Sequence, residues 1–188
     1  MDPINTARLT LRQWESADIL PFYEMCSDPE VMRFFPSTLT LGEVESAITR
    51  FSDHIERNQF GFWAAQRTES GEFIGFVGLK FVDDGFDFSP NVEIGWRLSK
   101  SSWGQGLATE AALESLKFGF ENRQLNEIVS MTPALNAPSE RVMQRIGMIG
   151  SPKKFAHPKL PLNHVLSEHV LYRLSRRDWL NQRKKGEV

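Results

Sequence analysis

Two glycines, Gly104 and Gly106, stand between a strand-like segment and a helix-like segment, and this arrangement most constrains what the chain can fold into. Apolar residues alternate over 92–98, as in a half-buried strand, and recur at helical spacing over 107–120. Glycine lets the backbone turn tightly and lets a ligand approach the main chain. A helix that starts directly after the turn presents unpaired N–H groups that suit phosphate. The segment therefore predicts an anion-binding turn.

The composition is that of an ordinary globular protein. The chain has 188 residues, 40% hydrophobic and 24% charged, enough for one sizeable core. We expect a single domain over residues 1–188, with a disordered basic tail from about 183 to 188. The net charge of -2 gives no overall attraction to nucleic acid or to an acidic membrane, so neither is expected as a partner.

The cysteine content and the hydropathy limit the cellular compartments in which the protein is expected. The single cysteine, Cys26, excludes an intramolecular disulfide and a multi-cysteine metal cluster, so a reducing compartment and no metal are expected. No stretch approaches the ~20 apolar residues of a membrane-spanning helix, and the first twelve residues lack the apolar core of a signal peptide. These features predict a soluble cytoplasmic protein, either a monomer or a homodimer.

The chain shows strand and helix patterns in alternation. Strands are predicted at 7–14, 60–67, 73–82, 92–98, 127–131 and 165–174, and helices at 16–27, 41–58, 107–120, 136–145 and 176–182. Thr40 and Glu43 form a capping box at the start of the second helix, and Gly147 is a stop signal after the fourth. The segment 155–161 is expected to be irregular. This order predicts a mixed α/β domain with both parallel and antiparallel strands.

Gly-x-Gly spacing alone does not separate a phosphate site from a purely structural turn. A dinucleotide-binding fingerprint needs a third small residue and an early βαβ unit, whereas these glycines come late, after antiparallel strands. A Walker loop needs Gly-Lys-Ser/Thr, which the chain lacks. Both of these nucleotide-binding motifs are therefore excluded.

Three sequence blocks narrow the interpretation of the glycine turn. They are Glu93-Ile94-Gly95-Trp96-Arg97-Leu98, Trp103-Gly104-Gln105-Gly106-Leu107-Ala108-Thr109-Glu110-Ala111, and a third from Asn136 through Gly147-Met148. With them the chain resembles the GCN5-related N-acetyltransferases, in particular the RimJ and RimL branch. The order of elements also fits over nearly the whole chain. The resemblance implies an α/β fold with a central twisted, mostly antiparallel sheet, a splayed parallel strand pair and flanking helices.

The resemblance also implies a binding site for acetyl-CoA, the acyl donor. In this family the glycine turn and the helix start hold the pyrophosphate through backbone N–H groups, which agrees with the anion-binding turn predicted above. The strand before the turn pairs with the pantetheine arm, and its neighbour at 127–131 splays away to leave a slot for the thioester. The implied cofactor-binding residues are Trp96, Leu98, Trp103, Gly104, Gln105, Gly106, Leu107, Ala108, Thr109 and Asn136.

The implied reaction transfers an acetyl group to a primary amine by direct attack in a ternary complex. Alignment of the two substrates is the main contribution, and a backbone N–H near Gly95 or Trp96 could bind the oxyanion. Ser139 matches the position of a residue suggested to protonate the leaving sulfur. Its structural alternative is to satisfy a backbone group in the first turn of a helix.

A base must remove a proton from the ammonium form of the acceptor. Glu168 lies where the RimL branch often has an acidic residue proposed as base, and Glu93 is the other acidic candidate. Carboxylates on strands are more often simply solvated. His164 and His169 could also take a proton near neutral pH, although a lone strand histidine is more often a hydrogen-bond partner. The residues leave the choice of base open.

The acceptor is left open as well. Three acidic residues before the cofactor strand, Asp83, Asp84 and Asp87, could attract a cationic amine, or they are a solvated loop. Phe34, Phe35 and Trp63 could line the same mouth or belong to the core. A peptide or protein N-terminus fits the branch, and a small amine fits the chemistry equally well. The rival functions are an acyl-CoA-binding module without catalysis and a purely structural α/β domain.

Overall fold

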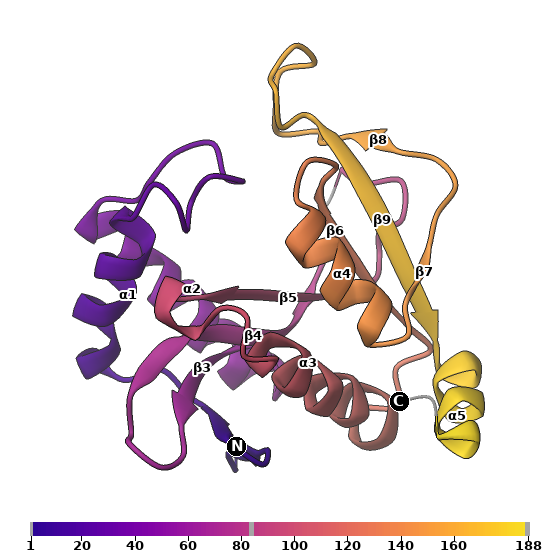
Figure 1. The fold of residues 1–188 in the computed structure, drawn as a ribbon, viewed down its shortest axis with the longest axis horizontal. Helices are drawn as coiled ribbons and strands as arrows, with labels where there is room; N and C mark the ends of the chain where they lie inside the picture. The colour runs from indigo at the N-terminus through magenta and orange to yellow at the C-terminus, as the bar shows by residue number, and fades with distance from the viewer. Residues whose placement is uncertain (1, 83–84, 187–188) are drawn as a thin grey trace. The chain divides into compact units, whose positions relative to one another are not determined.

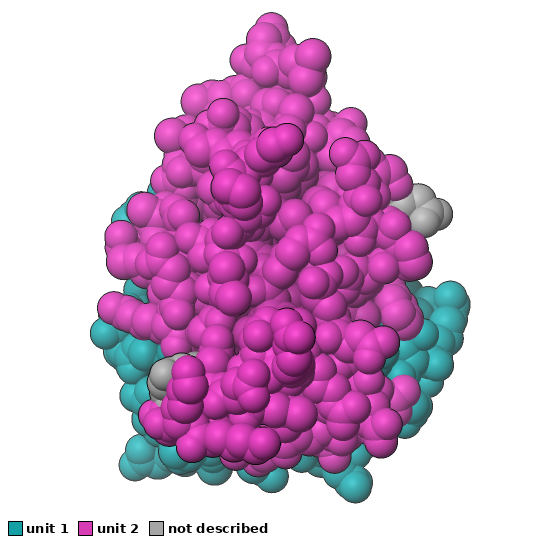
Figure 2. Space-filling model, turned by 90° about the vertical axis from the view of Figure 1, so that its right-hand side faces the viewer, with its two compact units in different colours: residues 1–80, 95–114 teal, residues 81–94, 115–188 magenta. Residues whose placement is uncertain are grey.

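The computed structural model describes residues 2–82 and 85–186, so Asp83 and Asp84 lie outside the described residues. Its elements are labelled in Figure 1. The chain divides into two compact units, residues 1–80 with 95–114 (unit 1) and residues 81–94 with 115–188 (unit 2), which Figure 2 shows in different colours. The division falls inside strand β5 (Val92–Leu98) and helix α3 (Leu107–Lys117), so both elements contribute residues to both units.

Unit 1 is built on antiparallel strands. Strands β1 (Ile4–Asn5), β2 (Leu9–Arg12), β3 (Phe62–Arg67) and β4 (Phe73–Phe81) pair in this order, and β4 is followed by β5. Two helices join β2 to β3: α1 (Ile19–Ser27), which is preceded by a 3-10 turn, and α2 (Leu41–Asn58). Helix α2 has the predicted bounds and the predicted capping box, because Glu43 N donates to Thr40 Oγ1 and Thr40 N donates to Glu43 Oε2.

An aromatic cluster fills the space between these helices and strands. Its ring centroids lie 5.0–6.2 Å from their neighbours. Its members are Trp14, Phe22, Phe51, Phe62, Phe73 and Phe76. Trp63 is fully buried, so of its two predicted alternatives the structure supports a place in the core. Neighbouring residues of a strand point to opposite faces, so Trp63, between Phe62 and Ala64 on β3, faces away from Phe62.

Unit 2 contains a parallel pair of strands. The start of β5 runs parallel to β6 (Glu127–Pro133), and β6 pairs antiparallel with β9 (Glu168–Ser175) along its whole length. The short strands β7 (Ile149–Gly150) and β8 (Phe155–Ala156) both pair with β9. Helix α4 (Ala137–Arg145) follows β6, and α5 (Arg176–Lys185) follows β9. The sheet is therefore mixed, mostly antiparallel and flanked by helices, as predicted.

Several boundaries and short strands differ from the sequence-based expectation. Strand β9 begins at Glu168 rather than at 165, because its partner β6 ends at Pro133, which faces His169. Strand β8 lies inside the segment predicted to be irregular, where β9 supplies a pairing edge. Helix α3 ends at Lys117 and continues as one turn of π-helix, Phe118–Asn122. Helix α5 continues to Lys185, into the segment predicted to be a disordered tail.

Membrane insertion through a helix finds no support in the fold. Among the helices in residues 2–82 and 85–186, none has both the length and the apolar character needed to cross a bilayer. The described residues also contain no group of three or more His, Cys, Asp or Glu side chains placed to hold a metal ion.

Candidate active site

The glycine turn, residues 103–106, has the backbone geometry that an anion site needs. Gly104 and Gly106 have φ of +72° and +76°, a region that residues with a Cβ rarely adopt. A Cβ added at Gly104 would meet no atom within 4 Å, and one at Gly106 would meet only Arg8 Nη2, at 3.7 Å, so the space beside the turn is open. No acceptor is found among the described residues for three backbone N–H groups at the start of α3, those of Leu107, Ala108 and Thr109.

A clamp from the N-terminal strands holds this helix start in place. Arg8 Nε donates to Glu110 Oε2 at 2.7 Å, and Arg8 Nη1 donates to the carbonyl of Gln105 at 3.0 Å. Thr6 Oγ1 and Arg8 N both donate to Glu110 Oε1, at 2.6 and 2.8 Å. Burial by itself would raise the pKa of Glu110, but these hydrogen bonds from Thr6 and Arg8 outweigh it and hold the pKa below its usual value. Sequence reasoning missed the clamp because its partners lie about a hundred residues apart.

The remaining side chains of the turn are tied to the protein. Trp103 Nε1 donates to the carbonyl of Leu98 at 2.9 Å, so this carbonyl of the predicted cofactor strand already has a partner. Gln105 Nε2 donates to Ser101 O at 2.7 Å, and Gln105 Oε1 accepts from Arg67 Nη2 at 2.9 Å. The side chains thus rigidify the turn and leave its backbone N–H groups for a ligand. Trp96, two residues before Leu98, is half-buried.

The backbone pairing between β5 and β6 ends in the region where the two strands are expected to splay apart. The parallel register joins Val92 to Ile128 and Glu93 to Val129. At the next position the hydroxyl of Ser130, rather than a backbone N–H, donates to the carbonyl of Ile94 at 2.9 Å, and this bond is buried. At this position a side-chain hydrogen bond therefore takes the place of the backbone hydrogen bonds that join the two strands. Ser130 is a second residue that sequence reasoning missed.

Asn136 and Ser139 form one hydrogen-bonded corner in unit 2. Asn136 caps α4, because Oδ1 accepts from Ser139 N at 3.3 Å. Both hydrogens of Asn136 Nδ2 are used, on Thr132 Oγ1 at 2.8 Å and on Ser139 Oγ at 3.0 Å. Ser139 Oγ is thus an acceptor in this corner, and no acceptor for its own hydrogen is found among the described residues. That hydrogen is available for donation.

The candidate bases lie in different environments. Glu168 is exposed and its carboxylate accepts from Lys154 Nζ at 2.7 Å. The next residue, His169, is buried, with Nδ1 3.1 Å from Ser167 O, and burial lowers its pKa. His164 Nδ1 accepts from Leu166 N at 3.1 Å. Glu93 is half-buried on β5, where it is the last residue of the parallel pairing. Glu168, His169 and His164 therefore each have a different hydrogen-bond partner.

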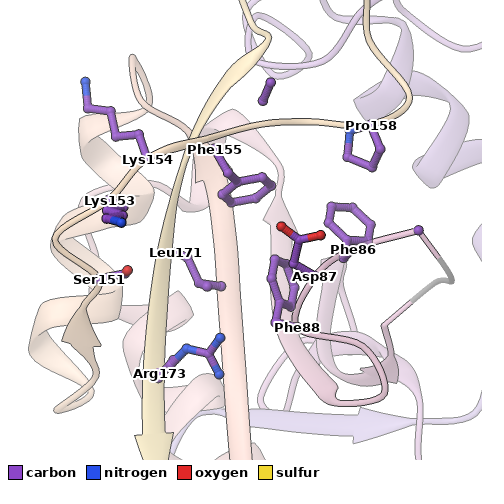
Figure 3. A pocket seen from close by; sticks show the side chains of 12 residues that line it. Phe86, Asp87, Phe88, Ser151, Lys153, Lys154, Phe155, Pro158, Leu171 and Arg173 are labelled. Carbon is purple, nitrogen blue, oxygen red and sulfur yellow. The ribbon is translucent and has the colours of Figure 1, made fainter.

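Unit 2 also contains a pocket of about 380 Å³. Figure 3 shows the side chains of Phe86, Asp87 and Phe155 close together in it, with Arg173 further along β9. Asp87 is the one member of the predicted acidic loop that the structure describes, and it lines this pocket. The pocket also has two lysines, of which Lys154 is paired with Glu168. It is therefore an aromatic hollow with charges of both signs rather than a purely acidic mouth.

The sequence was compared with known proteins. Residues 8–149 match a family model described as "Acetyltransferase (GNAT) domain". A protein of Bacillus subtilis named YkkB is 31% identical over 76% of this chain and 83% of its own length, and the N-acetyltransferase p20 of Bacillus licheniformis is 28% identical over 78% and 82%. An Aspergillus fumigatus protein named FsC-acetyl coenzyme A-N(2)-transacetylase is 31% identical over 66% of this chain and 54% of its own length.

Solved structures show the same fold. A GNAT-family acetyltransferase from Bacillus anthracis has a TM-score of 0.78 at 23% identity and covers 94% of this chain and 99% of its own. RimL, a ribosomal L7/L12 alpha-N-protein acetyltransferase in complex with coenzyme A, has a TM-score of 0.74 at 14% identity, over 93% and 98%. The ribosomal-protein-S5-alanine acetyltransferase of Vibrio fischeri scores 0.74 at 15% identity, over 95% and 99%. At these identities the likeness concerns the fold.

Proposed function

The chain belongs to the GNAT family of acetyltransferases, and from this premise we propose that it transfers the acetyl group of acetyl-CoA to a primary amine by direct attack in a ternary complex. The observation that carries the proposal is the set of open N–H groups at the start of α3, behind two glycines with positive φ. Such a helix start favours negative charge, and the absence of Cβ atoms lets a pyrophosphate come close. The residues present therefore fit the donor.

This geometry supports a proposal for the donor-binding residues. We propose that the N–H groups of Leu107, Ala108 and Thr109 hold the pyrophosphate, with the Gly104-Gln105-Gly106 turn shaping the approach. The indole of Trp103, which is 37% exposed, is held by its hydrogen bond to the carbonyl of Leu98. The backbone of β5 at Trp96 and Leu98 guides the pantetheine arm, together with Asn136. Bound acetyl-CoA supplies an activated acyl group whose thiolate can leave.

The chemical steps need few protein groups. We propose that the Ser139 hydroxyl gives its hydrogen to the leaving sulfur, since Asn136 Nδ2 occupies its oxygen and its hydrogen has no acceptor among the described residues. A backbone N–H near Gly95 or Trp96 stabilises negative charge on the carbonyl oxygen, beyond the point where β5 stops pairing with β6. Glu93 and Glu168 remain the candidate bases, acting directly or through water.

The acceptor class is a primary amine, either a protein or peptide N-terminus or a small molecule. The first choice is supported by the structural neighbours whose names give ribosomal proteins as substrates. The second is left open by the relative named FsC-acetyl coenzyme A-N(2)-transacetylase, which is 31% identical and whose name gives no protein as acceptor. We therefore propose a primary amine of either kind as the acceptor.

Release of free CoA thiol, measured with acetyl-CoA and a panel of small amines and peptide N-termini, tests the proposal. Thiol release that depends on an amine, with formation of the N-acetyl product, supports it. If CoA raises the melting temperature but no amine on the panel is acetylated, the rival binding module is favoured. If CoA does not change the melting temperature at all, both functions fail, because a ligand of the native state must stabilise it.

A pair of glycine variants tests the donor site. Gly106→Ala places a Cβ where φ is +76°, in the turn, whereas Gly71→Ala places one where φ is +74°, in the hairpin between β3 and β4. Both variants carry similar backbone strain, on the order of 1 kcal/mol or more. We expect only Gly106→Ala to lose the thermal stabilisation by CoA. Equal loss in both variants would show that strain, not the site, is responsible.

A further inference from the structure

Arg97 is a cation that the mechanism above does not use. It lies on β5 in unit 1, partly exposed, and its guanidinium stacks on the ring of Phe35 at 3.9 Å from the centroid. Among the described residues its side chain makes one hydrogen bond, from Nη1 to Cys26 Sγ, at 3.3 Å. Nε is buried without a partner, and no hydrogen bond of Nη2 is found among the described residues. Most of its donors are therefore unused.

The charge of this guanidinium is not compensated. No carboxylate of the described residues forms an ion pair with Arg97. Burial raises the pKa of the Cys26 thiol, so the sulfur at Nη1 is neutral at neutral pH. Burial also lowers the pKa of Arg97, but an arginine side chain remains protonated at neutral pH. Because a charged group with a buried donor is ordinarily paired, the buried Nε of this guanidinium indicates an anionic partner from outside the chain.

The side chains beside Arg97 connect it to the glycine turn. Phe35, which covers its guanidinium, is 36% exposed and belongs to the segment between α1 and α2. Two residues earlier, the guanidinium of Arg33 lies over the ring of Trp103, at 5.4 Å from the centroid. This short segment therefore contacts both Arg97 and the donor turn within unit 1. An anion bound at Arg97 would lie next to the same exposed segment.

We propose that Arg97 binds a carboxylate of the acceptor, so that the acceptor is an amine of the amino-acid type. A guanidinium offers two parallel N–H groups to a carboxylate, and this pairing is strong where water is partly excluded. The aromatic faces of Phe35 and Phe76 keep the guanidinium plane in position. The inference rests on the proposed acetyl transfer and narrows its acceptor. Acceptor recognition then depends on charge at Arg97 as well as on the reacting amine.

Matched acceptors test the proposal. Each α-amino acid is assayed beside its carboxamide and its decarboxylated amine, with the wild-type protein, Arg97→Gln and Arg97→Lys. We expect the wild type to prefer the amino acid, and Arg97→Gln to raise its KM by about 10- to 100-fold, the effect of losing a charge-assisted pair. The rates with carboxamides and amines, and the KM for acetyl-CoA, should stay unchanged. Arg97→Lys should recover part of the preference.

Arg57→Gln is the control, because it removes one positive charge from an exposed position on α2. The proposal is overturned if carboxamides or peptide N-termini serve as well as free amino acids in the wild type, if Arg97→Gln slows all acceptors equally, or if it raises the KM for acetyl-CoA instead.

A binding measurement separates this proposal from failure of acetyl transfer itself. N-acetyl amino acids, added without donor, should raise the melting temperature of the wild type but not of Arg97→Gln, whereas their carboxamides should have no effect on either. This result would support the anion site even if no amine is acetylated. Equal stabilisation of both proteins, or none of the wild type, overturns it.

Discussion

At the scale of single residues, the hydroxyl of Ser139 is distinguished by its hydrogen-bond role. In the first turn of a helix a serine usually serves the backbone, but here Asn136 performs the capping and its Nδ2 donates to the serine oxygen. The hydroxyl hydrogen of Ser139 is therefore not used in the cap of α4. This arrangement favours the catalytic interpretation over the purely structural one.

Ser139→Ala should therefore lower kcat by about 100-fold, the scale of general acid catalysis, with little change in the KM for acetyl-CoA. Steady-state kinetics of thiol release measure both parameters. The matched control is Ser46→Ala, which removes a hydroxyl that donates to Gly42 O on the exposed side of α2. An unchanged kcat in Ser139→Ala would return this serine to a structural role.

Glu110 links pH to the geometry of the donor site. Its pKa is lowered in the folded protein, so its contribution to stability is present above the usual value of 4.5 and is lost as pH falls through the lowered native pKa. Its partner Arg8 is half exposed, so the contribution is modest.

Glu110→Gln should lower the free energy of unfolding by about 1 kcal/mol at pH 7, and the difference from the wild type should shrink below pH 4.5. Thermal melts at several pH values measure it. Glu72→Gln, which breaks the exposed pair with Arg67, is the comparison and should have a smaller effect. A difference that persists unchanged at acid pH would contradict the assignment of the shift to this carboxylate.

At the scale of elements, the junction of β6 and α4 is determined by one side chain. Asn136 ties Thr132, near the end of β6, to Ser139 in the first turn of α4. Its two amide hydrogens are used, and only Oδ1 retains acceptor capacity. A ligand contact at this residue would therefore be made through its oxygen.

Asn136→Ala should destabilise the protein by about 1–2 kcal/mol, because α4 loses its cap, and should raise the KM for acetyl-CoA about tenfold. Asn136→Asp retains an acceptor oxygen and should bind acetyl-CoA nearly as well as the wild type. Thermal melts and donor titrations distinguish the two effects. If both variants bind the donor equally well, Asn136 acts only as a cap.

At the scale of the whole molecule, the two compact units share two elements. Residues of β5 and of α3 belong to both, so unfolding of one unit would remove part of a strand and part of a helix from the other. Small cooperative proteins unfold without populated intermediates. We therefore expect one transition in scanning calorimetry, with equal calorimetric and van't Hoff enthalpies. Two separated transitions would contradict the predicted single domain.

Local features were predicted correctly where neighbouring residues decide them. The capping box of Thr40 and Glu43 is complete within four residues, and the helix that it starts has the predicted bounds. The bounds of β5 and the positive φ values of the glycine turn also follow from residue type and periodicity. The edge strand β8 was missed, because it has two residues and exists only by pairing with β9.

The sequence by itself determined the order of elements, the family and the glycine turn, since each depends on residues that are close together along the chain. Only the tertiary structure decided what surrounds them. It joined Arg8 to Glu110, placed Ser130 at the end of the parallel pairing, and gave Arg97 no carboxylate partner from the part of the chain that the structure describes. These contacts depend on which distant side chains meet when the core is buried. The three sequence blocks around the turn therefore suggested the proposed donor, whereas the acceptor hypothesis required the charge environment of a folded strand.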